Sequence, residues 1–164
     1  NGKLKFVFYK HHYNNHGIVI EADKARITQV LSNLLNNAIK FTEEGTVYVN
    51  AINKIKANDQ EVIVSVRDTG DGIDSEIMPR LFTKFATKSD KGTGLGLFIC
   101  KNIIEAHGGR MWAENNADAI IEKETRGATF YFSLPLMNES SSSSAVANQH
   151  RQQNQSDYNQ WRRV

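Results

Sequence analysis

The 164-residue chain has a single cysteine, Cys100, which excludes a framework of internal disulfide bonds. Because Cys100 lies within an apolar run, we interpret it as a buried thiol in a reducing compartment. Only two prolines are present, and 40% of the residues are hydrophobic, which is typical of an ordinary globular domain with a core. We therefore expect a cytoplasmic domain.

Long apolar runs and an excess of charge of one sign are also lacking. No stretch approaches the roughly 18–20 apolar residues of a membrane span, and the N-terminus has no signal-peptide pattern. A net charge of +2 gives no argument for nucleic acid or a membrane surface as partner. We expect neither contact for this domain and leave the anchoring of its parent protein open. The charged, strand-like start of the chain suggests a fragment of a longer protein.

The composition changes sharply after Pro135. Residues 140–144 are all serine, and a stretch rich in Gln, Asn and Arg follows with little to bury. Such composition is typical of disorder. The sequence therefore predicts one folded domain over residues 1–137 and a disordered tail over residues 138–164.

Periodicity predicts the elements of the folded domain. A helix over residues 25–41 has Asp23 as its N-cap, and a second helix opens at the glycines of residues 92–96 and ends near His107. Residues 46–55 and 61–67 form a hairpin candidate. The other predicted strands cover residues 4–9, 18–20, 110–113 and 128–134, the last with strong alternation.

Three histidines, His11, His12 and His16, lie in the polar turn after the first predicted strand. They could be considered a metal cluster, but their spacing fits no tetrahedral template and no cysteine or acidic residue is nearby. We interpret them as part of a solvated turn.

The helix predicted over residues 25–41 carries two stripes. Its apolar residues recur at three- and four-residue spacing, while Asn33, Asn37 and Lys40 share a second face. Carboxamide oxygens can coordinate Mg²⁺, and an ammonium group can neutralise phosphate charge. We interpret this stripe as a site for a nucleoside triphosphate with its metal ion. The alternative is a polar helix edge.

Asp68, Gly70 and Gly72 stand at the end of a predicted strand. Glycines two residues apart leave room for a flat ligand close to the backbone, and a carboxylate can accept a hydrogen bond from an exocyclic amine. This combination favours adenine over guanine. An Asp-Gly turn within a hairpin has a similar sequence and is the alternative.

Gly92, Gly94 and Gly96 open the second predicted helix and are typical of a phosphate-binding loop. Glycines expose backbone N–H groups, and the helix directs its positive end towards a bound anion. The segment lacks the Gly-Lys-Ser/Thr of a Walker loop and the preceding strand of a dinucleotide fingerprint. A purely structural turn is the alternative.

In this order along the chain, the motifs resemble the ATP-binding catalytic domain of sensor histidine kinases. That family shares the Bergerat-fold (GHKL) superfamily with type II topoisomerases, heat-shock chaperones and mismatch-repair ATPases. The resemblance covers about residues 3–135. The N box of the family is matched by Asn33, Asn37 and Lys40, and its first glycine box by Asp68, Gly70 and Gly72. The F box is matched by Phe82 and Phe85, and the second glycine box by Gly92, Gly94 and Gly96.

The resemblance implies roles for the matched residues. Asn37 would be the main Mg²⁺ ligand with Asn33 assisting, Lys40 would meet the phosphates, and Asp68 would read the adenine amine. Asn33 and Lys40 are the expected catalytic residues. Gly127-Ala128-Thr129-Phe130 resembles the closing strand motif, whose threonine, here Thr129, assists at the adenine.

Residues 74–91 would form the mobile ATP lid, with Lys84 and Lys88 as candidate phosphate contacts. The expected nucleotide contacts also include residues beside the glycines, namely Ile73, Thr93, Leu95 and Leu97.

Position 33 bears on the type of reaction. ATPases of the superfamily place a glutamate four residues before the metal-binding asparagine, where it acts as a general base on water. Asn33 cannot take a proton, which favours holding ATP for transfer to a histidine on a separate helical dimerisation domain. Two alternatives remain: an ATP-hydrolysing or serine-directed kinase relative, and a degenerate module kept for protein interaction.

The phosphoacceptor signature, a histidine followed by an acidic residue and a proline in an amphipathic helix, is absent from the chain. The expected partners are therefore the dimerisation domain of the same protein and a downstream response regulator, and the fragment itself is expected to be monomeric. The implied fold is an α/β two-layer sandwich, with a mixed sheet of about five strands on about three helices, holding ATP and Mg²⁺.

Overall fold

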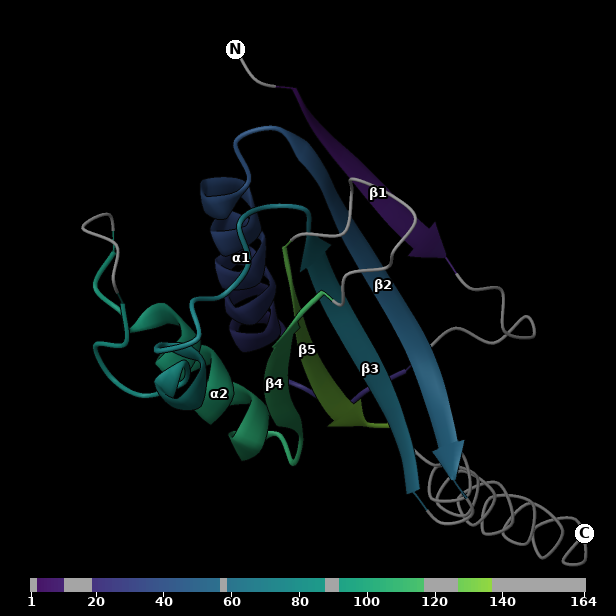
Figure 1. Cartoon of the computed structure of the whole chain (residues 1–164). Helices are drawn as coiled ribbons and strands as arrows, with labels where there is room; N and C mark the ends of the chain where they lie inside the picture. Colours follow the sequence, from purple (N-terminus) through teal and green to yellow (C-terminus); the bar gives the residue numbers. More distant parts are fainter. Residues whose placement is uncertain (1–2, 11–18, 57–58, 88–91, 117–126, 137–164) are drawn as a thin grey trace, which may run out of the picture.

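A mixed sheet forms one layer of the protein. The computed structural model describes residues 3–10, 19–56, 59–87, 92–116 and 127–136. Its five strands lie in the order β1-β2-β3-β5-β4, with β1 parallel to β2 and the other neighbours antiparallel (Figure 1). The strands are β1 (Leu4–Lys10), β2 (Gly45–Lys56), β3 (Asp59–Asp68), β4 (Arg110–Asn115) and β5 (Ala128–Pro135).

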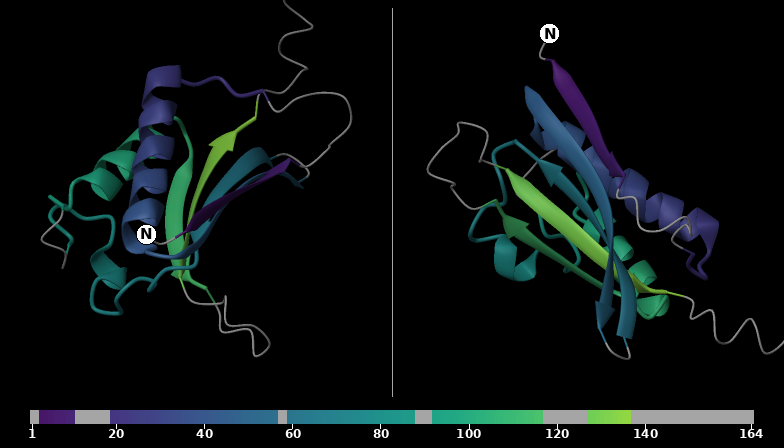
Figure 2. Two further views of the ribbon diagram at one scale, coloured as in Figure 1. Left: turned by 90° about the horizontal axis from the view of Figure 1, so that it is seen from above. Right: turned by 90° about the vertical axis from the view of Figure 1, so that its right-hand side faces the viewer.

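Two α-helices, α1 (Lys24–Phe41) and α2 (Gly96–Ala106), form the second layer and cover one face of the sheet (Figure 2). The predicted α/β sandwich is therefore confirmed. The described residues hold two α-helices rather than about three, and the remaining helical segment is a 3-10 turn at Met78–Arg80. Pro79 lies in the first turn of this segment, where its missing N–H costs no hydrogen bond.

The start of α1 and the end of α2 lie where the sequence predicts them. The Asp23 carboxylate accepts hydrogen bonds from the N–H groups of Ala25 (2.8 Å) and Arg26 (3.1 Å), which confirms the N-cap of α1. At the end of α2, Gly108 takes a φ of +73°, and the Gly109 N–H donates to the Ile104 carbonyl at 3.0 Å. These contacts define where α1 begins and where α2 ends.

The core lies between the layers. Its fully buried members come from both helices and from the central strands, namely Val30, Leu34, Cys100, Ile104, Val47, Val66 and Phe132. Full burial of such a side chain stabilises the fold by roughly 1.5–3 kcal/mol. The expectation that Cys100 is a buried free thiol is confirmed.

One strand prediction is wrong. Val19 and Ile20 form no strand; Val19 is 61% exposed, while Ile20 packs against the core. The closing strand predicted over residues 128–134 is confirmed as β5. It lies between β3 and β4, and its outward residues Thr129 and Ser133 are buried as well as its inward ones. The hairpin is confirmed, with register pairs from Val47–Asp68 to Lys56–Asp59. The three histidines and the predicted disordered tail lie outside the described residues.

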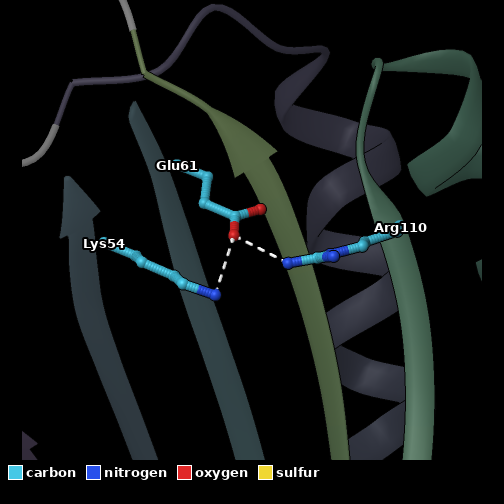
Figure 3. A network of polar contacts seen from close by, with 3 residues as sticks. All are labelled: Lys54, Glu61 and Arg110. Atoms are coloured by element: carbon cyan, nitrogen blue, oxygen red, sulfur yellow. Dashed lines mark hydrogen bonds and ion pairs between the residues drawn. The ribbon is translucent and has the colours of Figure 1, made fainter. Parts of the chain in front are cut away.

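The other face of the sheet carries polar and aromatic side chains. Glu61 accepts contacts from Arg110 at 2.8 Å and from Lys54 at 3.7 Å (Figure 3). The rings of Trp112 and Tyr131 stack 5.1 Å apart. Such a face is typical of a sheet that packs a core on one side and meets water on the other.

None of the helices in the described ranges combines the length and apolar character needed to cross a membrane.

Candidate functional site

A cavity of about 530 Å³ lies between the end of α1, the end of β3, residues 74–87 and the glycines before α2. This volume suits a small-molecule ligand of nucleotide size. Most of the predicted site residues line the cavity, namely Asn37, Lys40, Asp68, Gly72, Ile73, Gly92, Thr93, Gly94, Gly96 and Leu97. Motifs separated by up to sixty residues of sequence therefore meet at one place.

The polar stripe of α1 faces the second glycine segment. The Lys40 ammonium lies 3.1 Å from the position that a Cβ atom would take on Gly92. The Asn33 carboxamide oxygen lies 3.5 Å from the corresponding position on Gly96. Because the glycines lack side chains, the ammonium and the backbone N–H groups border the same space, which is the arrangement that an anion needs.

Asn33 points to α2 and does not line the cavity. Its Nδ2 donates to the Gly96 carbonyl at 3.5 Å and to the Cys100 sulfur at 3.4 Å. Burial raises the pKa of the Cys100 thiol, so the sulfur stays neutral as an acceptor. The structure therefore gives Asn33 contacts that join the two helices, next to Asn37 one helical turn away.

A backbone contact between Phe85 and Gly94 holds the glycine segment before α2 in place. The Phe85 N–H donates to the Gly94 carbonyl at 3.1 Å, and a Cβ on Gly94 would lie 2.7 Å from the Phe85 carbonyl carbon. Phe85 has a φ of +62° and is 70% exposed, whereas Phe82 packs against the core. Both phenylalanines of the predicted F box thus border the region, but only Phe82 is an apolar anchor.

Asp68 also lines the cavity and is 4% exposed. Its Oδ1 accepts hydrogen bonds from the N–H groups of Gly70 (3.0 Å) and Ala128 (3.2 Å). Burial raises the pKa of this carboxyl group, and the two N–H donors partly oppose the rise. Asp68 can therefore accept a hydrogen bond from an amine that enters the cavity.

Several predicted residues lie outside the lining. Gly70 is held against α1, since a Cβ there would be 2.0 Å from the Phe41 carbonyl oxygen, and Leu95 is the N-cap residue of α2. The Lys84 ammonium lies over the Phe98 ring at 5.1 Å. Lys88 is outside the described residues.

Thr129 also lies away from the cavity. Strand alternation places it on the face opposite to Ala128 and Phe130, which both line the cavity. Its hydroxyl donates to the Asn116 carboxamide oxygen at 2.6 Å. A direct contact of Thr129 with a ligand in the cavity therefore has no support in this geometry.

Sequence reasoning missed part of the lining and its support. The additional lining residues are Asn36, Phe41, Asp74, Ile77, Leu81, Ala86, Thr87, Ala128 and Phe130. It also missed Asn115 and Asn116, which bond to Ile73 and Asp68. Two successive carboxamides directly after a short strand were the available signal for this pair, because such residues often bond to nearby backbone.

The sequence matches a known family and several of its members. Residues 22–138 match the family described as histidine kinase-, DNA gyrase B- and HSP90-like ATPase. The chain is similar to the sensor protein FixL of Bradyrhizobium diazoefficiens, with 42% identity over 121 residues that cover 74% of this chain and 23% of that protein. It is 36% identical to the sensor histidine kinase WalK of Bacillus subtilis over 128 residues, 74% of this chain and 20% of WalK. The chain thus spans about a quarter or less of these relatives.

Solved structures agree with these sequence matches. The fold is similar to the catalytic domain of the histidine kinase ThkA, with a TM-score of 0.63, 37% identity, and coverage of 80% of this chain and 78% of that one. Full-length ShkA in complex with AMPPNP matches with a TM-score of 0.61 and 29% identity, covering 83% of this chain and 26% of ShkA. The chain therefore belongs to the histidine kinase-, DNA gyrase B- and HSP90-like ATPase family, as a catalytic domain of the sensor histidine kinase type.

Proposed function

We propose that the domain binds ATP with Mg²⁺ and donates the γ-phosphate to a histidine on a separate helical dimerisation domain, as the catalytic part of a two-component sensor kinase. One observation carries the proposal: a single cavity is lined by Asp68 and also by Lys40 with the glycine segment. Its volume and chemistry suit a base beside Asp68 and phosphates beside Lys40.

The base end is suited to adenine. Asp68 offers a carboxylate acceptor, and the walls around it are apolar, with Ile73, Ala128 and Phe130 in the lining. Adenine presents an exocyclic amine to such an acceptor, whereas guanine presents a carbonyl oxygen there and would repel it. Discrimination of this kind, in which a wrong partner leaves buried polar groups unpaired, is strong.

The phosphate end is suited to a triphosphate with its metal ion. Lys40 supplies a positive charge, and the N-terminus of α2 with Gly92, Gly94 and Gly96 supplies backbone donors. Among the described residues, no three His, Cys, Asp or Glu side chains gather to hold a metal. A neutral carboxamide such as Asn37 fits Mg²⁺ when phosphate oxygens and water complete the ligands, so the ion would bind with the nucleotide.

Transfer fits the site better than hydrolysis. Asn33 stands four residues before Asn37 and offers no group that could take a proton from water. The domain would position ATP and neutralise its charge, which is most of what catalysis of phosphoryl transfer requires. ShkA binds AMPPNP in its solved structure, FixL is a sensor protein and WalK is a sensor histidine kinase, which supports the same role here.

The nucleophile and the partners lie in other domains on this proposal. An imidazole of the dimerisation domain would receive the phosphate, and a response regulator would receive it next. We place the reaction in the cytoplasm and expect this domain by itself to be a monomer.

Isothermal titration of the 164-residue chain with ATP and Mg²⁺ tests the nucleotide site. We expect micromolar-range binding that is lost in Asp68→Asn and in Asn37→Ala. Unchanged ATP binding in both variants would show that this assignment of the nucleotide site is wrong. The transfer step is tested on the longer parent protein, where phosphate that is labile in acid and stable in base indicates phosphohistidine, and the opposite stability indicates a serine-directed kinase.

A further inference from the structure

Two adjacent carboxamides stand beside the base end of the cavity. Asn115 is the last residue of β4, and Asn116 follows it. Neither lines the cavity, but both bond to residues that do. They meet the loop of residues 68–73, which carries Asp68 at one end and Ile73 at the other.

Asn115 is bonded to both polar backbone groups of Ile73. Its Oδ1 accepts from the Ile73 N–H at 2.6 Å, and its Nδ2 donates to the Ile73 carbonyl at 2.8 Å. Since one planar carboxamide makes both bonds, the peptide groups on either side of Ile73 are fixed in orientation. Ile73 then presents its apolar side chain to the cavity, and the polar edge of a bound base is left to Asp68.

Asn116 holds the other end of the loop. Its Nδ2 donates to the Asp68 carbonyl at 2.9 Å, and its own N–H donates to the Gly127 carbonyl at 3.0 Å. Its Oδ1 accepts from the Thr129 hydroxyl at 2.6 Å. These bonds tie the main chain of Asp68 to the start of β5, the same strand whose Ala128 N–H donates to the Asp68 carboxylate.

Two glycines, Gly72 in the loop and Gly127 just before β5, make room for the close contacts around this loop. Gly72 has a φ of +83°, and a Cβ atom there would lie 2.9 Å from the Asn115 Oδ1. Gly127 has a φ of +114°, and a Cβ atom there would lie 2.1 Å from the Asp68 carbonyl oxygen. Glycine at both positions allows the close approach and the left-handed backbone that the contacts require. The glycines and the asparagines therefore act as one unit.

We propose that Asn115 and Asn116 form a carboxamide clamp, a pair of positioning residues that holds the loop of residues 68–73 in the shape that accepts the adenine base. The inference rests on the proposed binding of ATP. The clamp acts on affinity for the base through Asp68 and Ile73, and it has no contact with the phosphate end around Lys40.

The test compares a ligand that has a base with one that has none. Asn115→Ala and Asn116→Ala are titrated with ATP and Mg²⁺, and then with inorganic tripolyphosphate and Mg²⁺. We expect each variant to bind ATP about tenfold more weakly, equivalent to about 1.4 kcal/mol. Binding of tripolyphosphate should stay within about twofold, because Lys40 and the glycine segment are untouched. A general loss of structure would weaken both ligands together.

A control and a local probe sharpen the result. Asn102→Ala removes an exposed carboxamide that bonds to the Phe98 carbonyl on α2, and it should bind both ligands as the unchanged chain does. Hydrogen exchange at the Ile73 amide should be faster in Asn115→Ala than in Asn102→Ala, since its acceptor is gone. Asn115→Asp keeps the acceptor for the Ile73 N–H but places a carboxylate oxygen against the Ile73 carbonyl, so its loss of ATP affinity should be no smaller than that of Asn115→Ala.

The outcomes separate this inference from the function on which it rests. If the unchanged chain fails to bind ATP, both are wrong. If it binds ATP and Asn115→Ala binds within about twofold, or loses ATP and tripolyphosphate in equal proportion, the clamp alone is wrong. If Asn115→Ala does not fold, Asn115→Asp and Asn116→Ala are judged by the same two criteria.

Discussion

The Lys40 ammonium lies 3.1 Å from where a Cβ atom would stand on Gly92, a residue 52 positions later in the chain. The same ammonium lies over the Phe41 ring, 4.7 Å from its centroid. The ammonium thus lies between an aromatic face and the glycine segment, and Lys40 lines the cavity. This relationship joins two motifs that the sequence shows only as separate patterns.

Lys40→Met tests the charge at this place. The variant keeps an unbranched apolar stem and removes the ammonium, so affinity for ATP should fall at least about tenfold, in line with a charged hydrogen bond worth roughly 1.5–3 kcal/mol. Lys54→Met on the outer face is the matched control, because its ammonium meets Glu61 far from the cavity (Figure 3). Titration with ATP and Mg²⁺ measures both, and equal affinities would contradict the role of Lys40.

Gly94→Ala and Gly92→Ala should differ although both change a glycine of the same segment. Gly94 has a φ of +66°, and its Cβ would meet the Phe85 backbone at 2.7 Å, so the alanine should displace the segment and weaken ATP binding strongly. Gly92→Ala meets the movable end of Lys40 and should be tolerated much better. Titration of both variants checks this order, and a reversed order would show that the Phe85–Gly94 contact is unimportant.

Asp68 should give ATP binding a pH dependence. Burial raises the pKa of its carboxyl group above the ordinary 3.8, and only the ionised form accepts a hydrogen bond from the adenine amine without donating one. Affinity for ATP should therefore fall as the pH is lowered through this raised pKa, before an exposed aspartate would titrate. Titrations with ATP and Mg²⁺ at descending pH measure it, and the same titrations with inorganic tripolyphosphate and Mg²⁺ are the control for protonation of the phosphates. A midpoint at or below 3.8 would contradict the expectation.

The same shift has a consequence for folding. A pKa raised in the folded state means that Asp68 contributes stability below its unfolded pKa, which is lost as the pH rises through the folded pKa. Asp68→Asn keeps an oxygen that can accept from the N–H groups of Gly70 and Ala128 and carries no charge. Its stability in urea, relative to the unchanged chain, should therefore improve as the pH rises. A constant difference across pH would contradict this.

The sequence predicted the architecture well because long periodic segments dominate it. The N-cap at Asp23, the α1 stripe and the hairpin follow from local pattern alone. The strand predicted at residues 18–20 is wrong at Val19 and Ile20, because three apolar residues in a row are too short a pattern to distinguish a strand from a loop. The nearly complete burial of β5 depends on its central position in the sheet, which alternation in one segment cannot reveal.

The sequence motifs identified most of the residues of the site, but they did not indicate in which direction each side chain points. Motif spacing indicated Lys40, Asp68 and the glycines, and these meet at the cavity. Thr129 points to the outer face of the sheet. The register of β5 decides this, since it pairs Thr129 with Arg67 on β3 and with Glu114 on β4. Asn33 bonds to α2 because the two helices approach closely at Gly96, a distance that depends on tertiary packing. The clamp residues join β4 to a distant loop. The two successive asparagines signal bonds to backbone, but no local pattern indicates which loop they reach.

Gly70→Ala should destabilise the whole domain. A Cβ atom at this position would lie 2.0 Å from the Phe41 carbonyl oxygen, which is backbone and cannot rotate away. The end of α1 and the turn after β3 would have to separate, at a cost of roughly 1–3 kcal/mol typical of overpacking. Urea unfolding measures the change. Glu61→Gln, which weakens an outer-face ion-pair cluster, is the control and should cost less than about 1 kcal/mol.

We expect Asn33 to stabilise the packing of α1 against α2. We also expect the domain to hydrolyse ATP poorly. The Asn33 Nδ2 makes two long contacts to α2, at 3.5 Å to the Gly96 carbonyl and 3.4 Å to the Cys100 sulfur, so Asn33→Ala should cost about 1 kcal/mol in stability. Because a carboxamide cannot take a proton from water, steady-state hydrolysis of ATP by the unchanged chain should stay near background. A coupled assay measures the rate, with Asp68→Asn to reveal any contaminating ATPase. Brisk hydrolysis that disappears in Asp68→Asn would show that this site activates water after all, and would overturn the preference for transfer.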